Sequence, residues 1–317
     1  MKDADKMNFT TVTFLVTFFF TLNAYAEEKD HFFRMFINTP LQGVEFYQGE
    51  DTSGGARFRP NAASLASFTA GYKDFYLGIS FKGTAENTAK GETSYTNYRF
   101  SYNWRKFNFK AYYQAFQGFY LYKVNKDDGG FYVFPNFRTK NYGANVTYYF
   151  SKDYNRGVET IEFHNLMQEL DGAKKKDSSW FIKLGYDDNK IIDAPQNDSE
   201  LSTEEASDYI EMAEGEFKTF LMAFGLDFYY IVSDWFFDLK FGVGPGYQMQ
   251  TFTSRNEAID KTEVSSIFEI ELAFGYQIGT TLLSFQLESQ RIESDLQFNR
   301  GFTSSGEVIG LSISSAF

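Results

Sequence analysis

The chain has 317 residues, with 30 Lys and Arg against 42 Asp and Glu, a formal net charge of -12 and no cysteine. The charge argues against a nucleic-acid partner, which needs clustered cations, and the missing cysteine excludes disulfide bonds. Aromatic residues make up 20% of the chain, yet its mean hydropathy is only -0.39. Helical membrane proteins are more apolar than this, whereas a transmembrane β-barrel alternates lipid-facing apolar residues with polar interior ones.

The first 26 residues have the pattern of a secretory signal peptide. Two lysines precede an apolar run from Phe14 to Leu22, and Ala24-Tyr25-Ala26 supplies a small-x-small cleavage site. The apolar run is too short for an ordinary spanning helix, and no later segment offers about 18 consecutive apolar residues. We therefore expect residues 1–26 to be removed and residues 27–317 to form a single exported domain.

Strict alternation of apolar residues with other residues predicts β-strands throughout this domain. The clearest case runs from Phe220 to Val232 and continues, after Ser233-Asp234, from Trp235 to Val243, which predicts a tight hairpin of long strands. Further alternating segments lie, in chain order, at 32–47, before 72, and at 75–81, 98–104, 109–113, 142–150, 180–186, 268–278, 283–287 and 309–317.

Short and long connections alternate between these segments. Tight turns are expected near residues 73, 106, 152, 233 and 280, and long loops at 83–94, 118–140, 188–218, 250–263 and 293–306. In outer-membrane barrels the short turns face the periplasm and the long loops face outward. The pattern predicts an all-β, up-and-down antiparallel barrel of about 12 strands, or about 14 if Thr160–Phe163 and Ile191-Ile192 each add one. Three tryptophans fall beside proposed periplasmic turns or strand starts, as an aromatic girdle requires: Trp104, Trp180 and Trp235.

The last alternating segment contains Ile309, Leu311, Ile313 and a terminal Phe317. It resembles the assembly signal of bacterial outer-membrane barrels. The resemblance implies the outer membrane of a Gram-negative bacterium as the location, with the barrel assembly machinery and outer-membrane lipids as partners. The oligomeric state stays open.

Short motifs are spread over most of the mature chain: Pro60-Asn61, Gly71-Tyr72-Lys73, Gly78-Ile79-Ser80-Phe81, Ala173 to Ser179 and Gly242 to Gly246. Together they resemble a family of outer-membrane β-barrels known only as a domain of unknown function. The resemblance implies the barrel fold and the envelope location. It implies no chemistry, because the family has no assigned activity.

Charged residues at inward positions of the predicted strands are the candidate lumen-lining groups. They are Arg99, Arg105, Lys110, Lys183, Asp227, Asp238, Lys240, Glu269, Glu271 and Glu288. Early strands contribute cations and late strands contribute anions. In a closed barrel the two groups either face one another across an open lumen, as in diffusion porins, or pair as a salt-bridged plug. Simple solvation of the lumen, without transport, is the third possibility.

The loop from Asp193 to Glu216 contains nine acidic residues and no Lys or Arg. Ser202-x-x-Glu205 has the pattern of a capping box, and Gly215 can end a helix. This pattern predicts an exposed acidic helix at the outer mouth of the barrel. Such a helix either gathers cations or is a solvated loop that repels its neighbours.

Catalysis has little support in the sequence. The two histidines are His31 and His164, and Glu162-Phe163-His164-Asn165 lacks the pattern of the barrel phospholipases. Without cysteine, two distant histidines cannot build the usual zinc sites, and we expect no metal and no cofactor. The leading hypothesis is porin-like or channel passage of small solutes. A non-conducting structural or adhesive barrel is the first alternative, and an envelope lipid hydrolase the second.

Overall fold

The computed structural model describes residues 31–40, 43–48, 56–125, 129–151, 175–194, 212–254, 257–278, 281–295 and 300–316. The proposed signal peptide, Thr160–Phe163, His164, most of the acidic loop and Phe317 lie outside these residues. The elements are β1 (His31–Pro40), β2 (Gly43–Gln48), β3 (Ala56–Pro60), β4 (Leu65–Tyr72), β5 (Phe75–Lys82), the 3-10 helix η2 (Thr88–Lys90), β6 (Ser94–Trp104), β7 (Phe107–Asn125), β8 (Phe131–Tyr149), β9 (Lys175–Ile192), β10 (Met212–Val232), β11 (Trp235–Ser254), β12 (Glu257–Ile278), β13 (Thr281–Asp295) and β14 (Arg300–Ala316). No helix among the described residues is long and apolar enough to cross a membrane.

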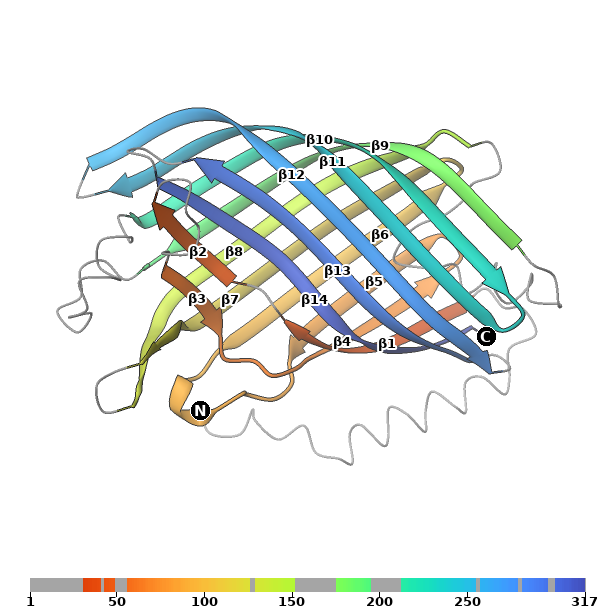
Figure 1. The fold of residues 1–317 in the computed structure, drawn as a ribbon, viewed down its shortest axis with the longest axis horizontal. Coiled ribbons are helices and arrows are strands. Elements are labelled where there is room, and N and C mark those ends of the chain that lie inside the picture. The colour runs from red at the N-terminus through yellow and green to blue at the C-terminus, as the bar shows by residue number, and fades with distance from the viewer. Residues whose placement is uncertain are drawn as a thin grey trace.

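The strands form one closed antiparallel barrel (Figure 1). The barrel closes where β14 pairs first with β2 and then with β1 along its length. Strand β3 pairs with β2, and β4 pairs with β1. Thus β1 and β2 together act as one interrupted strand, and β3 and β4 together act as another. The barrel therefore has 12 strands, which confirms the lower of the two predicted numbers. Closure pairs the first strand with the last, so the barrel has no terminal strand with one side left unpaired along its length.

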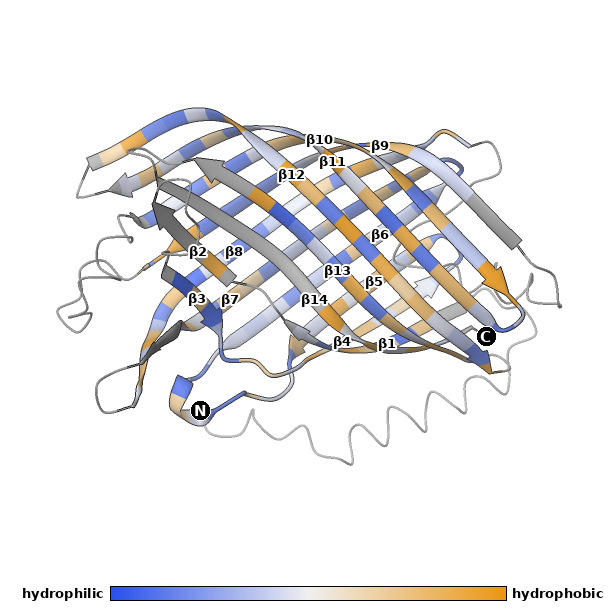
Figure 2. Cartoon of the chain, in the orientation of Figure 1, coloured by the Kyte–Doolittle hydropathy of each residue, from blue (hydrophilic) through white to orange (hydrophobic). Residues whose placement is uncertain are grey.

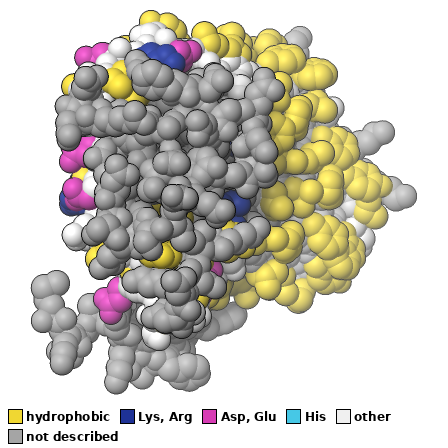
Figure 3. Space-filling view, turned by 60° about the vertical axis from the view of Figure 1, so that its left-hand side comes forward, with side chains coloured by type: hydrophobic (Ala, Val, Ile, Leu, Met, Phe, Trp, Pro, Cys, Tyr) yellow, Lys and Arg dark blue, Asp and Glu magenta, His cyan; other side chains and the backbone are white. Residues whose placement is uncertain are grey.

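The wall of the barrel follows the predicted alternation. Bands of apolar and polar residues alternate along β10 to β13 in Figure 2. On β10 the outward Phe220, Met222 and Phe224 are each about half exposed, whereas the inward Leu221 and Ala223 are buried. Figure 3 shows the apolar side chains as a broad band over the wall. An apolar outer surface combined with a more polar interior is typical of a barrel that spans a membrane.

The two ends of the barrel differ in their connections. Turns at 73–74, 105–106 and 233–234 lie at the end where β1 begins and β14 ends, which we call the turn end. They confirm three expected tight turns, and β12 and β13 are likewise separated by two residues. The tight turn expected near residue 152 is wrong, because β8 ends at Tyr149 and β9 begins only at Lys175. We call the opposite end, at the left of Figure 1, the loop end.

Three of the long loops expected at the loop end are largely strand. Residues 118–140, 250–263 and 293–306 mostly belong to strand pairs that continue past the apolar segments. The signal was missed because strand beyond a membrane needs no lipid-facing apolar residues. Ile191-Ile192 ends β9 rather than forming a separate strand, and Gly215 lies within β10 rather than ending a helix.

The barrel narrows towards the loop end on one side. Strands β5 and β6 have only 8 and 11 residues, and beyond them β3 pairs directly with β7. A bulge in β7 lies at this point, because its register against β8 shifts between Gln117 and Phe119. The intervening Gly118 has a φ of 86°, and a side chain there would meet the carbonyl oxygen of Glu92 at 2.0 Å. The glycine lets the β5–β6 connection lie against β7.

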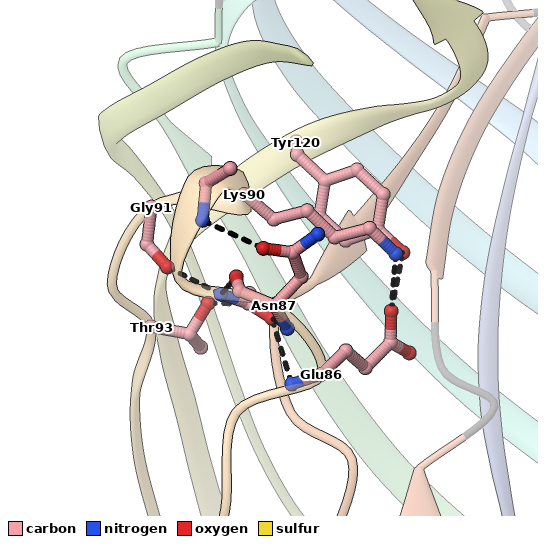
Figure 4. Close-up of polar contacts among 8 residues, drawn as sticks. Glu86, Asn87, Lys90, Gly91, Thr93 and Tyr120 are labelled. Carbon is pink, nitrogen blue, oxygen red and sulfur yellow. Dashed lines mark hydrogen bonds and ion pairs between the residues drawn. The ribbon is translucent and has the colours of Figure 1, made fainter. Parts of the chain in front are cut away.

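Asn61, at the corner between β3 and β4, holds that connection in place. Its Nδ2 donates to the carbonyl oxygens of Asn87 (2.7 Å) and Gly91 (2.5 Å), and its backbone N–H donates to Thr93 Oγ1 at 2.8 Å. Its Oδ1 accepts from the backbone N–H groups of Glu86 (2.9 Å) and Asn87 (3.2 Å). The connection around these residues is drawn in Figure 4.

Lys90 fastens the same connection to the outer face of β7. Its Nζ donates to Glu86 Oε2 at 2.5 Å and to the hydroxyl of Tyr120 at 3.1 Å, contacts that Figure 4 draws. Partial burial works against the charged ammonium, but the bonds to Glu86 and Tyr120 outweigh it and raise the pKa of Lys90. The short side of the barrel is therefore sealed by a loop with a defined structure.

Candidate functional site in the barrel lumen

Most of the charges predicted to line the lumen lie on the inner face of the barrel. Lys183, Asp227, Asp238, Lys240 and Glu269 are each at most 8% exposed. A cavity within the lumen is lined by the others, Arg99, Lys110, Glu271 and Glu288.

Arg105 is the exception and corrects the prediction. It lies in the turn between β6 and β7 with a φ of 54°, where alternation no longer sets the direction of a side chain. Its guanidinium carbon lies 5.7 Å from the centre of the Trp104 ring, at the turn end. Arg105 is therefore a rim residue.

Buried ion pairs join three strands in the middle of the lumen. Glu269 on β12 pairs with Lys183 on β9, and it lies 3.7 Å from Lys240 on β11. Lys240 also pairs with Glu271 at 3.3 Å. These four side chains form what we call the ion-pair belt. Since Lys183 reaches past β10 and β11 to its partner, the belt bridges part of the lumen.

Inward glycines make this reach possible. Gly225 and Gly242 lie in register between Phe181 and Glu269. The ring of Phe181 covers both glycines, and a side chain at Gly225 would meet it at 2.5 Å. Because these two glycines have no side chains, the Phe181 ring packs directly against the backbone of the barrel wall. This leaves space for the side chains of Lys183 and Glu269 to meet above it.

A second ion pair crosses the barrel itself. Arg99 on β6 lies 3.5 Å from Glu288 on β13, and the shorter way around the wall between them passes β5, β4, β1 and β14. A cation from an early strand thus meets an anion from a late strand, as the plug version of the prediction requires. The opposing charges are paired rather than separated by an open channel.

A polar cavity of about 140 Å³ lies among these ion pairs. One wall carries the row Tyr112, Gly143 and Asp187, which are register partners on β7, β8 and β9. The Tyr112 hydroxyl donates to Asp187 Oδ2 across Gly143, where a side chain would meet the hydroxyl at 2.7 Å. Sequence reasoning missed this contact, because it depends on the register of three strands.

An apolar layer occupies the lumen at the loop end, and sequence analysis missed it as well. Its buried members are Val44, Phe58, Ala62, Leu65, Tyr95, Phe116, Phe119, Leu121, Tyr132, Phe137, Ile191, Ala194, Phe217 and Phe252. They come from β2, β3, β4, β6 to β11, the β3–β4 corner and, for Ala194, the segment directly after β9, so they surround much of the lumen. The rings of Phe58 and Phe137 meet edge to face with centres 5.2 Å apart. The inward parity of Phe217 and Phe252 was a usable signal, but the strands were expected to stop short of both.

The remaining candidates are only partly described. Leu311 and Ile313 face outward on β14, where they pair with Ile37 and Met35 at the seam. His31 begins β1 opposite Tyr72 at the turn end. Within the described residues, no group of three or more His, Asp or Glu side chains is arranged to hold a metal ion.

Comparisons with known proteins bear on the fold and the family. No curated protein matches the sequence. The outer membrane protease OmpT from Escherichia coli shares 8% identity at a TM-score of 0.40, over 90% of this chain and 96% of that one. The toluene transporter TodX from P. putida shares 10% identity at a TM-score of 0.30, over 94% of this chain and 92% of that one. Neisserial surface protein A shares 8% identity at a TM-score of 0.25, over 91% of this chain and 97% of that one.

These solved structures are outer-membrane barrels, and at such identities and TM-scores nothing about activity follows from them. A family model carries further, because it covers most of the sequence. The model described as a domain of unknown function, DUF4421, matches residues 23–306. The chain therefore belongs to the DUF4421 family.

Proposed function

We propose that the protein is an outer-membrane barrel that holds a small polar solute in its lumen and passes it along a pathway that is closed at rest. The polar cavity of about 140 Å³ among the ion pairs carries the proposal. A wide diffusion pore needs a continuous water path, whereas Arg99–Glu288 crosses this lumen and Lys183–Glu269 bridges part of it. The short turns and the exposed apolar wall support an outer membrane with the turn end in the periplasm.

Planar bilayer recordings test the closed pathway. We expect wild-type protein to give rare, brief openings. Replacing Phe58 and Phe137 together by Ala removes two fully buried rings from the apolar layer and should produce frequent conductance steps. Phe150→Ala is the control, because it also removes a phenylalanine ring, but from an outward position that is 51% exposed.

Two results would count against the proposal. Large, steady conductance of the wild type would show an open porin instead of a closed pathway. Silence of a correctly folded Phe58→Ala, Phe137→Ala variant would favour the non-conducting barrel, with its activity in the loops. Migration on gels before and after heating reports whether each variant is folded, because closed barrels resist detergent until they are heated.

A further inference from the structure

Besides Glu269 Oε1, which lies 3.7 Å from Lys240 Nζ, four buried oxygen atoms of residues that line the cavity accept no hydrogen bond from any described residue. They are the Oδ1 atoms of Asn97 on β6, Asn141 and Asn145 on β8, and Asp187 on β9. The Asn141 amide and the Asp187 carboxylate also lie within hydrogen-bonding reach of each other. Asn97 and Asp187 are only 2% and 1% exposed. Buried acceptors in proteins are nearly always paired, so this wall is built to receive donors from a molecule in the cavity.

A cation without a close ion pair lies beside these acceptors, near enough to Glu269 and Glu271 for their charges to interact with it. Lys110 on β7 lines the same cavity and is the register partner of Asn145. It forms no ion pair or hydrogen bond with any residue that the structure describes. The neighbouring cations Arg99 and Lys183 are instead held by glutamates. Lys110 is therefore the available cation of the cavity, one inward row from Tyr112 and Asp187.

The size and charge of the cavity limit what fits. At roughly 10–15 Å³ per water-sized particle, 140 Å³ accommodates a molecule of about ten non-hydrogen atoms. A simple anion would face four acceptors without offering donors to them. A simple cation would leave Lys110 without a counter-charge and would itself lie close to the positive charge of the lysine.

We infer that this cavity binds a small zwitterion with one ammonium and one carboxylate group, such as a free α-amino acid. The ammonium donates to Asp187 and the asparagine oxygens, and the carboxylate accepts from Lys110. Glu269, Glu271 and Glu288 do not compete for the ammonium, because lysine and arginine partners already neutralise them. The inference rests on the proposed lumen pathway and names its class of solute.

Calorimetric titration of the purified barrel in detergent tests this assignment. The probes are L-glutamine, glutaramate, which lacks the amine, and 4-aminobutanamide, which lacks the carboxylate. We expect glutamine to bind at least about tenfold more tightly than either fragment, since each fragment loses one charge-assisted contact. Equal affinities, or no binding by any probe to folded protein, would overturn the inference.

Variants assign the two charged contacts. Lys110→Gln should weaken glutamine binding about tenfold or more and leave 4-aminobutanamide binding unchanged. Asp187→Asn should weaken glutamine and 4-aminobutanamide alike and leave glutaramate unchanged. Lys106→Gln makes the same charge change in the β6–β7 turn and should alter nothing. An equal loss of all probes in Lys110→Gln would mean that the lysine is merely structural, which contradicts the assignment.

The outcomes separate this inference from the proposed passage. If glutamine shows no preference but the Phe58→Ala, Phe137→Ala variant conducts, the zwitterion assignment fails and the passage stands. If glutamine binds selectively but no variant conducts, the assignment holds for a barrel that binds its solute without passing it.

Discussion

At the scale of single residues, small and amide side chains decide where charged groups can go. Gly143 has no side chain, and for that reason the Tyr112 hydroxyl reaches Asp187 on the next strand but one. Asn61 uses both ends of its amide to fix the β5–β6 connection. Alternation predicted which charges face inward, such as Lys183 and Glu269. It could not predict these contacts, because they depend on register and on a corner between strands.

Removing the amide of Asn61 should loosen the short side of the barrel. In Asn61→Ala the backbone groups of Glu86, Asn87 and Gly91 lose their partner, at a cost of about 0.5–1.5 kcal/mol for each hydrogen bond, because these partly exposed groups can bond to water instead. We expect faster proteolytic cleavage between residues 83 and 93 and unfolding at a lower urea concentration. Asn136→Ala, at an exposed position on β8, is the control. Equal protease resistance of the two variants would show that Asn61 does not hold the loop.

Filling the space at Gly143 should break the contact between Tyr112 and Asp187. In Gly143→Val the new side chain collides with the tyrosine, and overpacking of this kind typically costs about 1–3 kcal/mol. The expected result is a lower unfolding midpoint together with weaker glutamine binding. Ala144→Val adds bulk one position along the strand, on the outward face, and should be tolerated. If both variants behave alike, the row across β7, β8 and β9 has no special role.

At the scale of elements, the sequence located nearly every strand but set many of their ends too early. The apolar outward residues that mark β11 and β12 stop near the middle of strands of 20 and 22 residues. Beyond that point the apolar residues, such as Tyr247 and Val264, are scattered among polar ones, and a single sequence with this pattern cannot be told from a loop. The same error hid the apolar layer, whose Phe217 and Phe252 lie in the corresponding parts of β10 and β11.

The ion-pair belt that joins β9, β11 and β12 should be a major source of stability. Replacing Glu269 and Glu271 by Gln leaves Lys183 and Lys240 buried without a counter-charge, at a cost of about 3–5 kcal/mol for each broken pair. We expect a clearly lower unfolding midpoint and the appearance of leak conductance.

Glu263→Gln is the matched control for this double substitution. Glu263 lies on the same strand, but its ion pair with Lys261 is partly exposed and contributes little. Unchanged stability of the double variant, with no leak, would show that the belt neither closes the lumen nor holds the barrel together.

At the scale of the whole molecule, the fold class and the strand number could be read from the sequence, because every strand obeys the same two-residue period. The state of the lumen could not, since pairing and separation of Arg99 and Glu288 are equally compatible with inward positions. Only the closed geometry brings these two side chains within 3.5 Å. The seam between β14 and β1 is equally a property of the closed barrel.

Assembly at that seam gives a prediction about location. The mature protein should begin after Ala26 and fractionate with the outer membrane, and its gel mobility should change on heating. Deleting Phe317 should reduce insertion without affecting export, because the alternating C-terminal sequence would lose its terminal aromatic residue. Normal outer-membrane levels of the deletion variant would remove the recognition role of this ending, and recovery of the intact chain as a soluble periplasmic protein would contradict the membrane barrel.

The unequal strand lengths give the mouth of the barrel a slope. The 22 residues of β12 span about 70 Å at about 3.3 Å per residue, or about 50 Å of height at a tilt of about 45°. An apolar band needs only about 25 Å of that height. The 8 residues of β5 rise about 19 Å by the same arithmetic, so β5 ends near the lipid surface while β12 stands well above it. A molecule that approaches along the membrane therefore meets a high wall on the β12 side. On the β5 side it meets a low edge formed by the β5–β6 connection that Asn61 holds.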